Sequence, residues 1–582
     1  MRYADRAIKK EYMKKKTILL LALFLATSIW AQPTFIRNVN LVDVRNGKII
    51  PAQTIVINGK KIEQIGASSE IAPISGASTI DGSGKYLMPG MTDAHIHFFQ
   101  SGGLYTRPDA VDLRKKVPYE RERDFGVRNA ADYLSRYLRL GITSVVDVGG
   151  PMSNFAIRDT VGKSGLFPNI LATGPLFSMI ESDKFGNDKP IIKVTSSYEA
   201  DVLLDKMLPF KPDFIKVWYI VGPDLPAEKN FALVKHIADR THANGLKLAV
   251  HATELKTAQL AVEAGADILV HSIDDELVPE DFVNKLVANK VTYIPTLIVS
   301  HGYYNVFSGK LPHHPQDLAW ANAFAYGSIT DPEAMSEEEL PSVLRRARKN
   351  GIPESAKKED SISAANLMKL HNAGVNIATG TDAGNIGTFH ASSYIQELEA
   401  MQRAGLSITE VIKTSTINPA IGFGRDQQWG SIEKGKLANL LLLKKNPFES
   451  LKNLSGIELI YIDGKELAPD SIVKESPDAV VQRQVNAYNA RDINAFMDAY
   501  SEDVELFSFP NKLTERGKAD MRKGYEGLFS KVTNLYCEIE KRMVIGNKVI
   551  DHEKVRAGTK TIRAVAVYEV EDGKIRRVTF IK

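Results

Sequence analysis

Two histidines separated by a single residue, His95 and His97, stand in the segment MTDAHIH. On a β-strand, residues i and i+2 point to the same face, so both imidazoles would share one side of a strand. His251 in LAVHAT, His271 in ILVHSI and Asp382 in ATGTDAG each follow or end an apolar run of their own. Imidazole and carboxylate groups are the ligands that zinc and similar divalent metals prefer. These five residues together predict a metal site.

A lysine completes the set of candidates. Lys216 stands in the apolar segment DFIKVWY, between Phe214 and Trp218. An unpaired ammonium is costly to bury, and apolar surroundings favour the neutral amine instead. A lysine in such a segment therefore needs a chemical explanation, and we place it with the metal-ligand candidates.

The elements that would position these residues alternate regularly along the middle of the chain. Strand-like apolar runs occur at LMPGMTDAHIH, GITSVVDVGG, NILATGPL, DFIKVWYI, LKLAVHAT, DILVHSI, VTYIPTLIV and NIATGTDAG. Most are separated by segments with helical periodicity, such as FALVKHIADRTHANG. This pattern predicts an α/β fold with a (β/α)₈ TIM barrel over residues 89–428. All six candidates fall at C-terminal strand ends, where such barrels carry their chemistry.

The segments on either side of the barrel have a different residue pattern. Residues 33–88 contain short β-branched runs broken by Asn-Gly turns at 46–47 and 58–59, which are hairpin signals. A related pattern returns at residues 429–470. We expect the two segments to form one small β-sandwich into which the barrel is inserted.

Two further regions complete the predicted organisation. Residues 300–359 are long, polar and broken by prolines, so we expect a helical insertion after the seventh strand that acts as a lid. Residues 476–582 read as two helices, a strand, a third helix and closing strands, which predicts a separate α+β domain.

Composition limits the classes of function. With 582 residues, the chain is long enough for two to four domains, and 44% hydrophobic and 25% charged residues are ordinary for globular proteins. The net charge of +4 is spread along the chain, so we expect a small-molecule substrate and no nucleic acid partner. Cys537 is the single cysteine, which excludes an intramolecular disulfide and a multi-cysteine zinc site.

The N-terminus has the pattern of an export signal. From Met13 the chain reads MKKKTILLLALFLATSIWAQ, in which lysines precede an apolar run and a small residue follows it, as at a cleavage site. The apolar run is shorter than the roughly 20 residues of a spanning helix, although an uncleaved anchor stays an alternative. We predict a signal peptide over residues 1–31 with Met13 as an alternative initiator, a periplasmic or secreted product, and no membrane span in the mature chain.

Several motifs resemble those of a known family. MPGMTDAHIH, GTDAG, TINPAIGFG and GSIEKGKLANLLLL are similar to motifs of the amidohydrolase superfamily, over about residues 33–470. Within it, the chain resembles the imidazolonepropionase-like and prolidase-like binuclear branch. The C-terminal segment, with YNARDINAFMDAYSEDVEL, resembles the cone-shaped fold of SnoaL-like cyclases and ketosteroid isomerase. Such a domain would serve dimerisation or small-ligand binding, or hold a second catalytic pocket.

The family resemblance implies a particular centre with two divalent metal ions, for which zinc fits best and manganese, cobalt or iron stay open. It assigns one metal to His95, His97 and Asp382 and the other to His251 and His271. Lys216, carboxylated by carbon dioxide to a carbamate, and a hydroxide would bridge the two.

The implied reaction is hydrolysis of an amide C–N bond, in a dipeptide or N-acyl amino acid, with Asp382 as general base and acid. The alternatives are a cyclic-amide hydrolase of the hydantoinase or imidazolonepropionase type, a deaminase, and a non-catalytic binding protein. Lys216 argues against mononuclear deaminases, which lack the bridging lysine. We also expect a homo-oligomer.

Residues next to the ligands are candidates for substrate contact, with packing or helix capping as the alternative. They are Trp218, Tyr219, His301, Tyr303, Tyr304 and His390.

Overall fold

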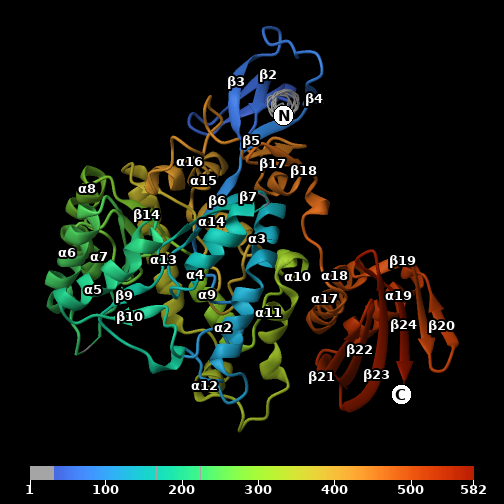
Figure 1. Cartoon of the computed structure of the whole chain (residues 1–582). Helices are drawn as coiled ribbons and strands as arrows, with labels where there is room; N and C mark the ends of the chain where they lie inside the picture. The colour runs from blue at the N-terminus through green and yellow to red at the C-terminus, as the bar shows by residue number, and fades with distance from the viewer. Residues whose placement is uncertain (1–31, 165–166, 223, 582) are drawn as a thin grey trace, which may run out of the picture.

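The computed structural model describes residues 32–164, 167–222 and 224–581. Figure 1 shows a β-rich part at the top, a larger α/β body below it and a C-terminal β-rich body to one side. The predicted signal peptide lies outside the described residues. Among the described helices, none is long and apolar enough to cross a membrane.

Both flanking segments contribute to one mixed sheet of eight strands. Its members are β1 (Thr34–Asp43), β2 (Lys48–Asn58), β3 (Lys61–Ala67), β4 (Ser78–Asp81), β5 (Tyr86–Pro89), β16 (Leu440–Leu443), β17 (Ile457–Ile462) and β18 (Lys465–Leu467). The two Asn-Gly turns connect β1 to β2 and β2 to β3, and both pairs are antiparallel. Early and late strands meet where β5 pairs with β16, so the two ends of the segment are held together (Figure 1). Hydrogen bonds connect all eight strands into one sheet.

All eight strands expected in the middle of the chain are present. They are β6 (Met91–Ile96), β7 (Ile142–Asp147), β8 (Asn169–Ala172), β11 (Ile215–Trp218), β12 (Leu248–His251), β13 (Ile268–Val270), β14 (Thr292–Ile294) and β15 (Asn376–Ile377). Their pairing differs from one continuous eight-stranded barrel. β6, β7 and β8 form one parallel sheet, while β11 to β15 continue a second parallel sheet.

The break between the two sheets has a local cause. The run NILATGPL is interrupted at Gly174, whose φ of +80° is outside the strand region, and by the proline after it. The run therefore gives two strands, β8 and β9 (Leu176–Ser178). β8 pairs with β7, whereas β9 pairs with β11 and with β10 (Ile191–Lys193), which the sequence pattern did not reveal.

Backbone hydrogen bonds link β6 to the segment that follows β15. The Ala94 amide donates to the Thr379 carbonyl at 2.9 Å, and the Asp382 amide donates to the His95 carbonyl at 2.8 Å. The His97 amide also donates to the Ala383 carbonyl at 2.8 Å. The first and last strands of the α/β body are thus side by side at the end where the candidate residues lie.

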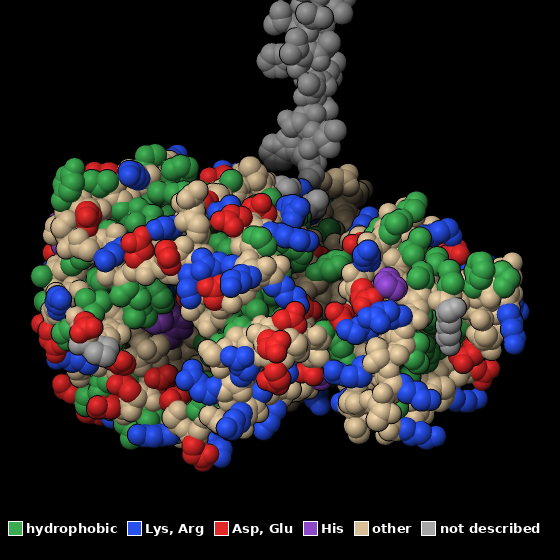
Figure 2. Space-filling view, turned by 90° about the horizontal axis from the view of Figure 1, so that it is seen from below, with side chains coloured by type: hydrophobic (Ala, Val, Ile, Leu, Met, Phe, Trp, Pro, Cys, Tyr) green, Lys and Arg blue, Asp and Glu red, His purple; other side chains and the backbone are tan. Residues whose placement is uncertain are grey.

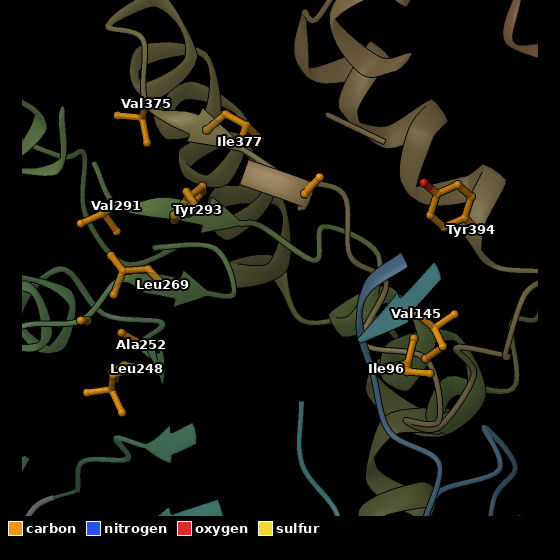
Figure 3. Close-up of a cluster of buried hydrophobic side chains, with 14 of the residues drawn as sticks. Ile96, Val145, Leu248, Ala252, Leu269, Val291, Tyr293, Val375, Ile377 and Tyr394 are labelled. Carbon is orange, nitrogen blue, oxygen red and sulfur yellow. The ribbon is translucent and has the colours of Figure 1, made fainter. Parts of the chain in front are cut away.

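Amphipathic helices cover the strands. They include α2 (Tyr119–Arg128), α3 (Ala130–Arg139), α5 (Ser197–Met207), α6 (Ala227–Ala243), α7 (Leu255–Ala264), α8 (Glu280–Ala288), α13 (Glu354–Asn372), α14 (Tyr394–Ala404), α15 (Ile408–Thr414) and α16 (Ile417–Gly422). Figure 3 shows part of the buried core, with Ile96, Val145, Leu248, Leu269 and Tyr293 coming from five different strands of the two parallel sheets. Burying one such side chain stabilises the fold by about 1.5–3 kcal/mol, so this core holds the strand ends in place.

The predicted insertion is helical. It contains α9 (Val299–Ser308), α10 (Pro315–Trp320), α11 (Ala323–Ser328) and α12 (Ser342–Asn350). Asn322 begins α11 as its N-cap, because its side chain accepts from the amides of Phe324 and Ala325. Its helices α10 and α11 contact the first helices of the C-terminal domain.

The C-terminal domain has the predicted order of helices and strands. It contains α17 (Pro477–Ala490), α18 (Ile493–Asp498), β19 (Tyr500–Ser508), β20 (Lys512–Arg516), α19 (Lys518–Lys531), β21 (Tyr536–Ile545), β22 (Lys548–Ala557), β23 (Lys560–Glu571) and β24 (Lys574–Ile581). The six strands form one sheet in the order β20-β19-β24-β23-β22-β21, and the helices pack against it around a core of their own.

A buried carboxylate joins this domain to the α/β body. Glu475 accepts from Arg136 of α3 at 2.8 Å and from Nε of Arg483 of α17 at 3.0 Å. Arg483 also donates to the Leu318 carbonyl of α10 at 2.7 Å. Burial alone would raise the pKa of Glu475, but the charges of Arg483 and Arg136 lower it to about 2.

We predict that Glu475→Gln weakens this docking, because the substitution leaves Arg483 without its counter-charge and Arg136 with Asp132 alone. The expected cost is about 3–5 kcal/mol of unfolding free energy, measured by denaturant titration with limited proteolysis of the inter-domain segment. Since the folded pKa lies below the usual value near 4.5, this stabilisation should be complete above about pH 5 and decline as the pH falls towards 2.

The matched control is Asp470→Asn, which removes the exposed partner of Arg139 in the same region. Exposed pairs contribute little, so this variant should behave like the unaltered protein. Equal stability of both variants at pH 7 would contradict a docking role for Glu475.

Candidate metal centre

The structure brings the predicted ligand residues to neighbouring strand ends. His95 lies in β6, Lys216 in β11, and His251 is the last residue of β12. His97 and His271 directly follow β6 and β13, and Asp382 lies in the segment beyond β15. Because the strands are parallel, their C-terminal ends meet on one side of the body.

Three histidine side chains surround the carboxylate of Asp382. The Nε2 atoms of His95 and His97 lie 3.3 and 3.1 Å from Oδ1 of Asp382 and 3.3 Å from each other. Oδ2 of Asp382 lies 3.9 Å from Nδ1 of His271. Ligand atoms of His95, His271 and Asp382 all lie within 4.8 Å of one another, a spacing that suits a single metal ion.

The second pair of histidines lies alongside the first. The ring centroids of His251 and His271 are 4.3 Å apart, and those of His95 and His271 are 4.9 Å apart. Burial, together with the neighbouring charges of Lys216 and the other histidines, lowers the pKa of His95, His251 and His271 well below the usual value. These imidazoles are therefore neutral, which is the form that binds metals.

Lys216 is 1% exposed and close enough to affect the charge of all three of these histidines. Burial lowers the pKa of its amine to about 7, although the carboxylate of Asp382 acts in the opposite direction. A large share of the lysine is therefore a neutral, nucleophilic amine near neutral pH.

The donor set fits divalent metal ions. Oδ1 of Asp382 is buried and has no hydrogen-bond partner among the described residues, although two imidazole nitrogens lie close to it. Nδ1 of His97 contacts the Gly149 carbonyl at 2.7 Å, which fixes the ring with Nε2 directed to the cluster. Neutral imidazoles and a carboxylate without hydrogen bonds are what a zinc-type ion requires.

Asp93 links the two main motifs, and the sequence analysis missed it. Its buried carboxylate accepts from the Thr381 hydroxyl at 2.7 Å and from the Thr381 amide at 3.0 Å. Asp93 stands two residues before His95, and Thr381 directly precedes Asp382. An aspartate two residues before the histidine pair was the available signal.

Close approach of the two motifs also requires glycine. A Cβ on Gly380 would lie 2.7 Å from Cβ of His95, and one on Gly384 would lie 2.6 Å from the His97 carbonyl oxygen. His271 and Asp382 themselves adopt positive φ of 78° and 58°, which is strained for residues with a side chain. Such strain is common where a site holds side chains in a fixed geometry.

A cavity of about 280 Å³ opens next to His271, and its lining includes His301, Asp274, Glu359 and Asp360. In the space-filling view, histidine side chains lie inside a hollow of the larger body (Figure 2). Burial and the neighbouring Glu359 raise the pKa of Asp274 to about 6. The cavity is therefore bordered by acidic side chains on the side of α13.

Arg107 provides a positive charge near the same centre, and no sequence pattern pointed to it. Its Nη1 donates to Oδ1 of Asn385 at 2.7 Å, and Tyr303 donates to the same oxygen at 2.7 Å. Nε and Nη2 bind Asp109 at 2.8 and 2.6 Å. These bonds use three of the five guanidinium N–H groups, and the charge is close enough to influence Asp382 and His271.

The other predicted neighbours divide into two groups. Trp218 lies edge-on to His251 with ring centroids 6.0 Å apart, and the Tyr304 hydroxyl donates to Glu359 at 3.1 Å. Tyr219 is instead a core residue whose hydroxyl donates to the Ala227 carbonyl. His390 is buried and stacks on Tyr133 with ring centroids 4.3 Å apart. It neither caps a helix nor lines the cavity beside His271.

Comparison with known proteins identifies the family of the chain. The model of the amidohydrolase family matches residues 86–467, and that of the SnoaL-like domain matches residues 481–578. The chain belongs to the amidohydrolase family and carries a C-terminal SnoaL-like domain. Both parts of the predicted family assignment are confirmed.

Individual relatives are distant. Enamidase of Eubacterium barkeri is 24% identical over 254 residues, which is 41% of this chain and 56% of that protein. The chain thus spans about half the length of this curated relative. A crystal structure of a Xaa-Pro dipeptidase with bound methionine aligns over 75% of this chain and 100% of its own, with TM-score 0.57 and 21% identity. Molinate hydrolase aligns over 76% and 96%, with TM-score 0.57 and 18% identity. At these identities, the similarity to the two solved structures establishes a shared fold.

We predict that Thr381→Val disturbs the centre, because it removes the hydroxyl that donates to buried Asp93. The expected loss is about 1–3 kcal/mol of unfolding free energy and about 10- to 100-fold in metal affinity. Calorimetric unfolding and metal titration check this. Thr381→Ser keeps the donor and should retain most of both quantities, and a serine variant as impaired as the valine variant would contradict this role.

Proposed function

We propose that the protein hydrolyses an amide C–N bond at a binuclear metal centre. The observation that carries this proposal is the convergence of four histidines, Asp382 and Lys216 at neighbouring strand ends. Membership of the amidohydrolase family supports it. A hydrolysis screen over dipeptides, N-acyl amino acids and cyclic amides tests it directly. Hydrolysis that requires divalent metal is expected, and no metal-dependent turnover of any amide would contradict it.

In this proposal His95, His97 and Asp382 hold one metal, while His251 and His271 hold the other. When bound, the metals supply an activated water and polarise the substrate carbonyl. Zinc fits these nitrogen and oxygen donors best. The contacts of His97 with Gly149 and of Asp93 with Thr381 keep the donor atoms in position.

Lys216 contributes the bridging ligand. Its neutral amine forms an N–C bond with carbon dioxide and loses one proton, which gives an anionic carbamate with two oxygens. An ammonium in this buried position would repel two metal ions, whereas a carbamate has the opposite charge. Placement of the lysine beside three neutral imidazoles supports this role.

Asp382 is the proton carrier of the proposed reaction. Its Oδ1 lies among the donor atoms and has no hydrogen-bond partner in the described part of the chain, so it can accept a proton from the attacking water. It then gives the proton to the leaving amine, which makes the amine a better leaving group.

The charges around the centre favour a dipeptide as the substrate. Arg107 has two guanidinium N–H groups beyond its three bonds, enough to bind a carboxylate. Asp274, Glu359 and Asp360 outnumber Arg403 in the lining of the cavity and suit a positive amino group. An N-acyl amino acid would use Arg107 alone, and a neutral cyclic amide would use neither. A cyclic-amide hydrolase is therefore the second candidate.

The remaining expectations belong to the same proposal. We propose an exported, periplasmic or secreted homo-oligomer, with a closed (β/α)₈ barrel over residues 89–428 and a small β-domain from residues 33–88 and 429–470. Hydrogen bonds between β6 and the segment after β15 support closure of the barrel at that edge.

The lysine prediction is specific. Lys216→Ala should lower metal content and reduce turnover by several orders of magnitude, because both metals lose a ligand at once. Metal analysis and steady-state kinetics measure these effects, and acetate or propionate should restore part of the rate by replacing the carbamate oxygens.

Lys216→Arg is the matched variant, since a guanidinium stays cationic and forms no carbamate. It should be as inactive as the alanine variant. A near-normal rate with two bound metals in Lys216→Arg would contradict the bridge and leave the lysine a structural role.

Arg107→Gln should reduce kcat/KM for dipeptides about 10- to 100-fold, because a charge-assisted hydrogen bond of about 1.5–3 kcal/mol is lost. Dipeptide amides, which lack the carboxylate, should lose much less. Arg114→Gln changes an exposed arginine of the same loop and should leave both rates unaltered. An equal loss of kcat/KM for dipeptides and for dipeptide amides would show that Arg107 has a structural role only.

A further inference from the structure

A second cavity lies within the C-terminal domain, away from the metal-ligand cluster. It has a volume of about 500 Å³ and opens between the helices α17 and α19 and the sheet. Its walls include the rings of Tyr488, Tyr500, Tyr525 and Tyr568. Nothing in the proposed hydrolysis uses this cavity.

Two buried acceptor atoms of the cavity lining have no partner among the described residues. Gln484 is 5% exposed, and its Oε1 has no hydrogen-bond partner among the described residues. Oε2 of Glu515 is likewise buried and unpaired within that set. A buried acceptor without a partner costs about 1–3 kcal/mol, so a donor from a ligand would be favourable here.

The charge inside the cavity has one sign. Glu515 and Glu553 are the charged residues of its described lining, in which neither lysine nor arginine occurs. Glu553 is 6% exposed and accepts from the Tyr568 hydroxyl at 2.6 Å. Burial raises the pKa of this carboxyl to about 7, because its charged form has lost contact with water. A cation beside the carboxylate would stabilise that charged form in place of water. An anionic ligand would find no counter-charge.

From this geometry we infer that the C-terminal domain binds a small organic amine with an aromatic or similarly apolar body. The ammonium lies against Glu553 and donates to the free oxygen of Gln484, and the tyrosine rings enclose the apolar part. Tyrosine faces attract cations, and an aromatic cage with a carboxylate is a common way to bind an ammonium group. The domain is then a ligand-binding module in addition to the catalytic body.

The test uses the full-length protein and three probes of equal size. Benzylamine is a cation, benzyl alcohol is neutral and benzoate is an anion, and binding is measured by calorimetry and ligand-observed NMR. We expect benzylamine to bind at least tenfold more tightly than benzyl alcohol, with no binding of benzoate. Failure of benzylamine to bind at millimolar concentration, or equal binding of benzoate, would overturn the inference.

Variants locate the site. Glu553→Gln keeps the size of the side chain and removes its charge, and should weaken the binding of benzylamine at least tenfold. Glu540→Gln alters an exposed carboxylate outside the cavity lining and should bind like the unaltered protein. If Glu553→Gln fails to fold by circular dichroism, Gln484→Leu takes its place with the same expected loss. Unchanged affinity in the folded variant would overturn the inference.

Lys216→Ala separates this cavity from the metal centre. Benzylamine should bind this variant as tightly as the unaltered protein, whatever the outcome for hydrolysis. Loss of binding in Lys216→Ala with retention in Glu553→Gln would assign the amine to the metal centre and overturn the inference.

Discussion

The burial of a lysine amine among neutral imidazoles is the constraint on which this structure depends. Lys216 cannot keep an isolated positive charge at 1% exposure without a large cost in free energy. In the proposed centre, conversion to a carbamate would reverse the sign of this charge and give the metals an anionic ligand. The four histidines and Asp382 would supply the remaining ligands.

Such a site requires that strands far apart in the chain meet at one place. The hydrogen bonds of Asp93 with Thr381, and of the Asp382 amide with the His95 carbonyl, provide that meeting. Gly380 allows the close approach, because a side chain there would collide with His95. The positive φ of Asp382 is the cost of directing its carboxylate at the histidines.

Much of this arrangement could be predicted because the ligand residues have local signals. His95 and His97 are two apart on a strand, and each remaining ligand stands in or after an apolar run. The division of the parallel strands into two sheets could not be foreseen, because NILATGPL looks like one strand until Gly174 bends it. Arg107 was missed because its partner Asn385 lies 278 positions away in the chain. The tyrosine-lined cavity likewise arises from residues on separate helices and strands.

The most direct test of the central claim is a measurement on the metal-loaded protein prepared with carbon-13-labelled bicarbonate. We predict two divalent metals per chain by elemental analysis, together with one carbamate resonance in the carbon-13 NMR spectrum that disappears in Lys216→Met. Two metals without a carbamate resonance, or a resonance that persists in Lys216→Met, would contradict the bridging role of Lys216.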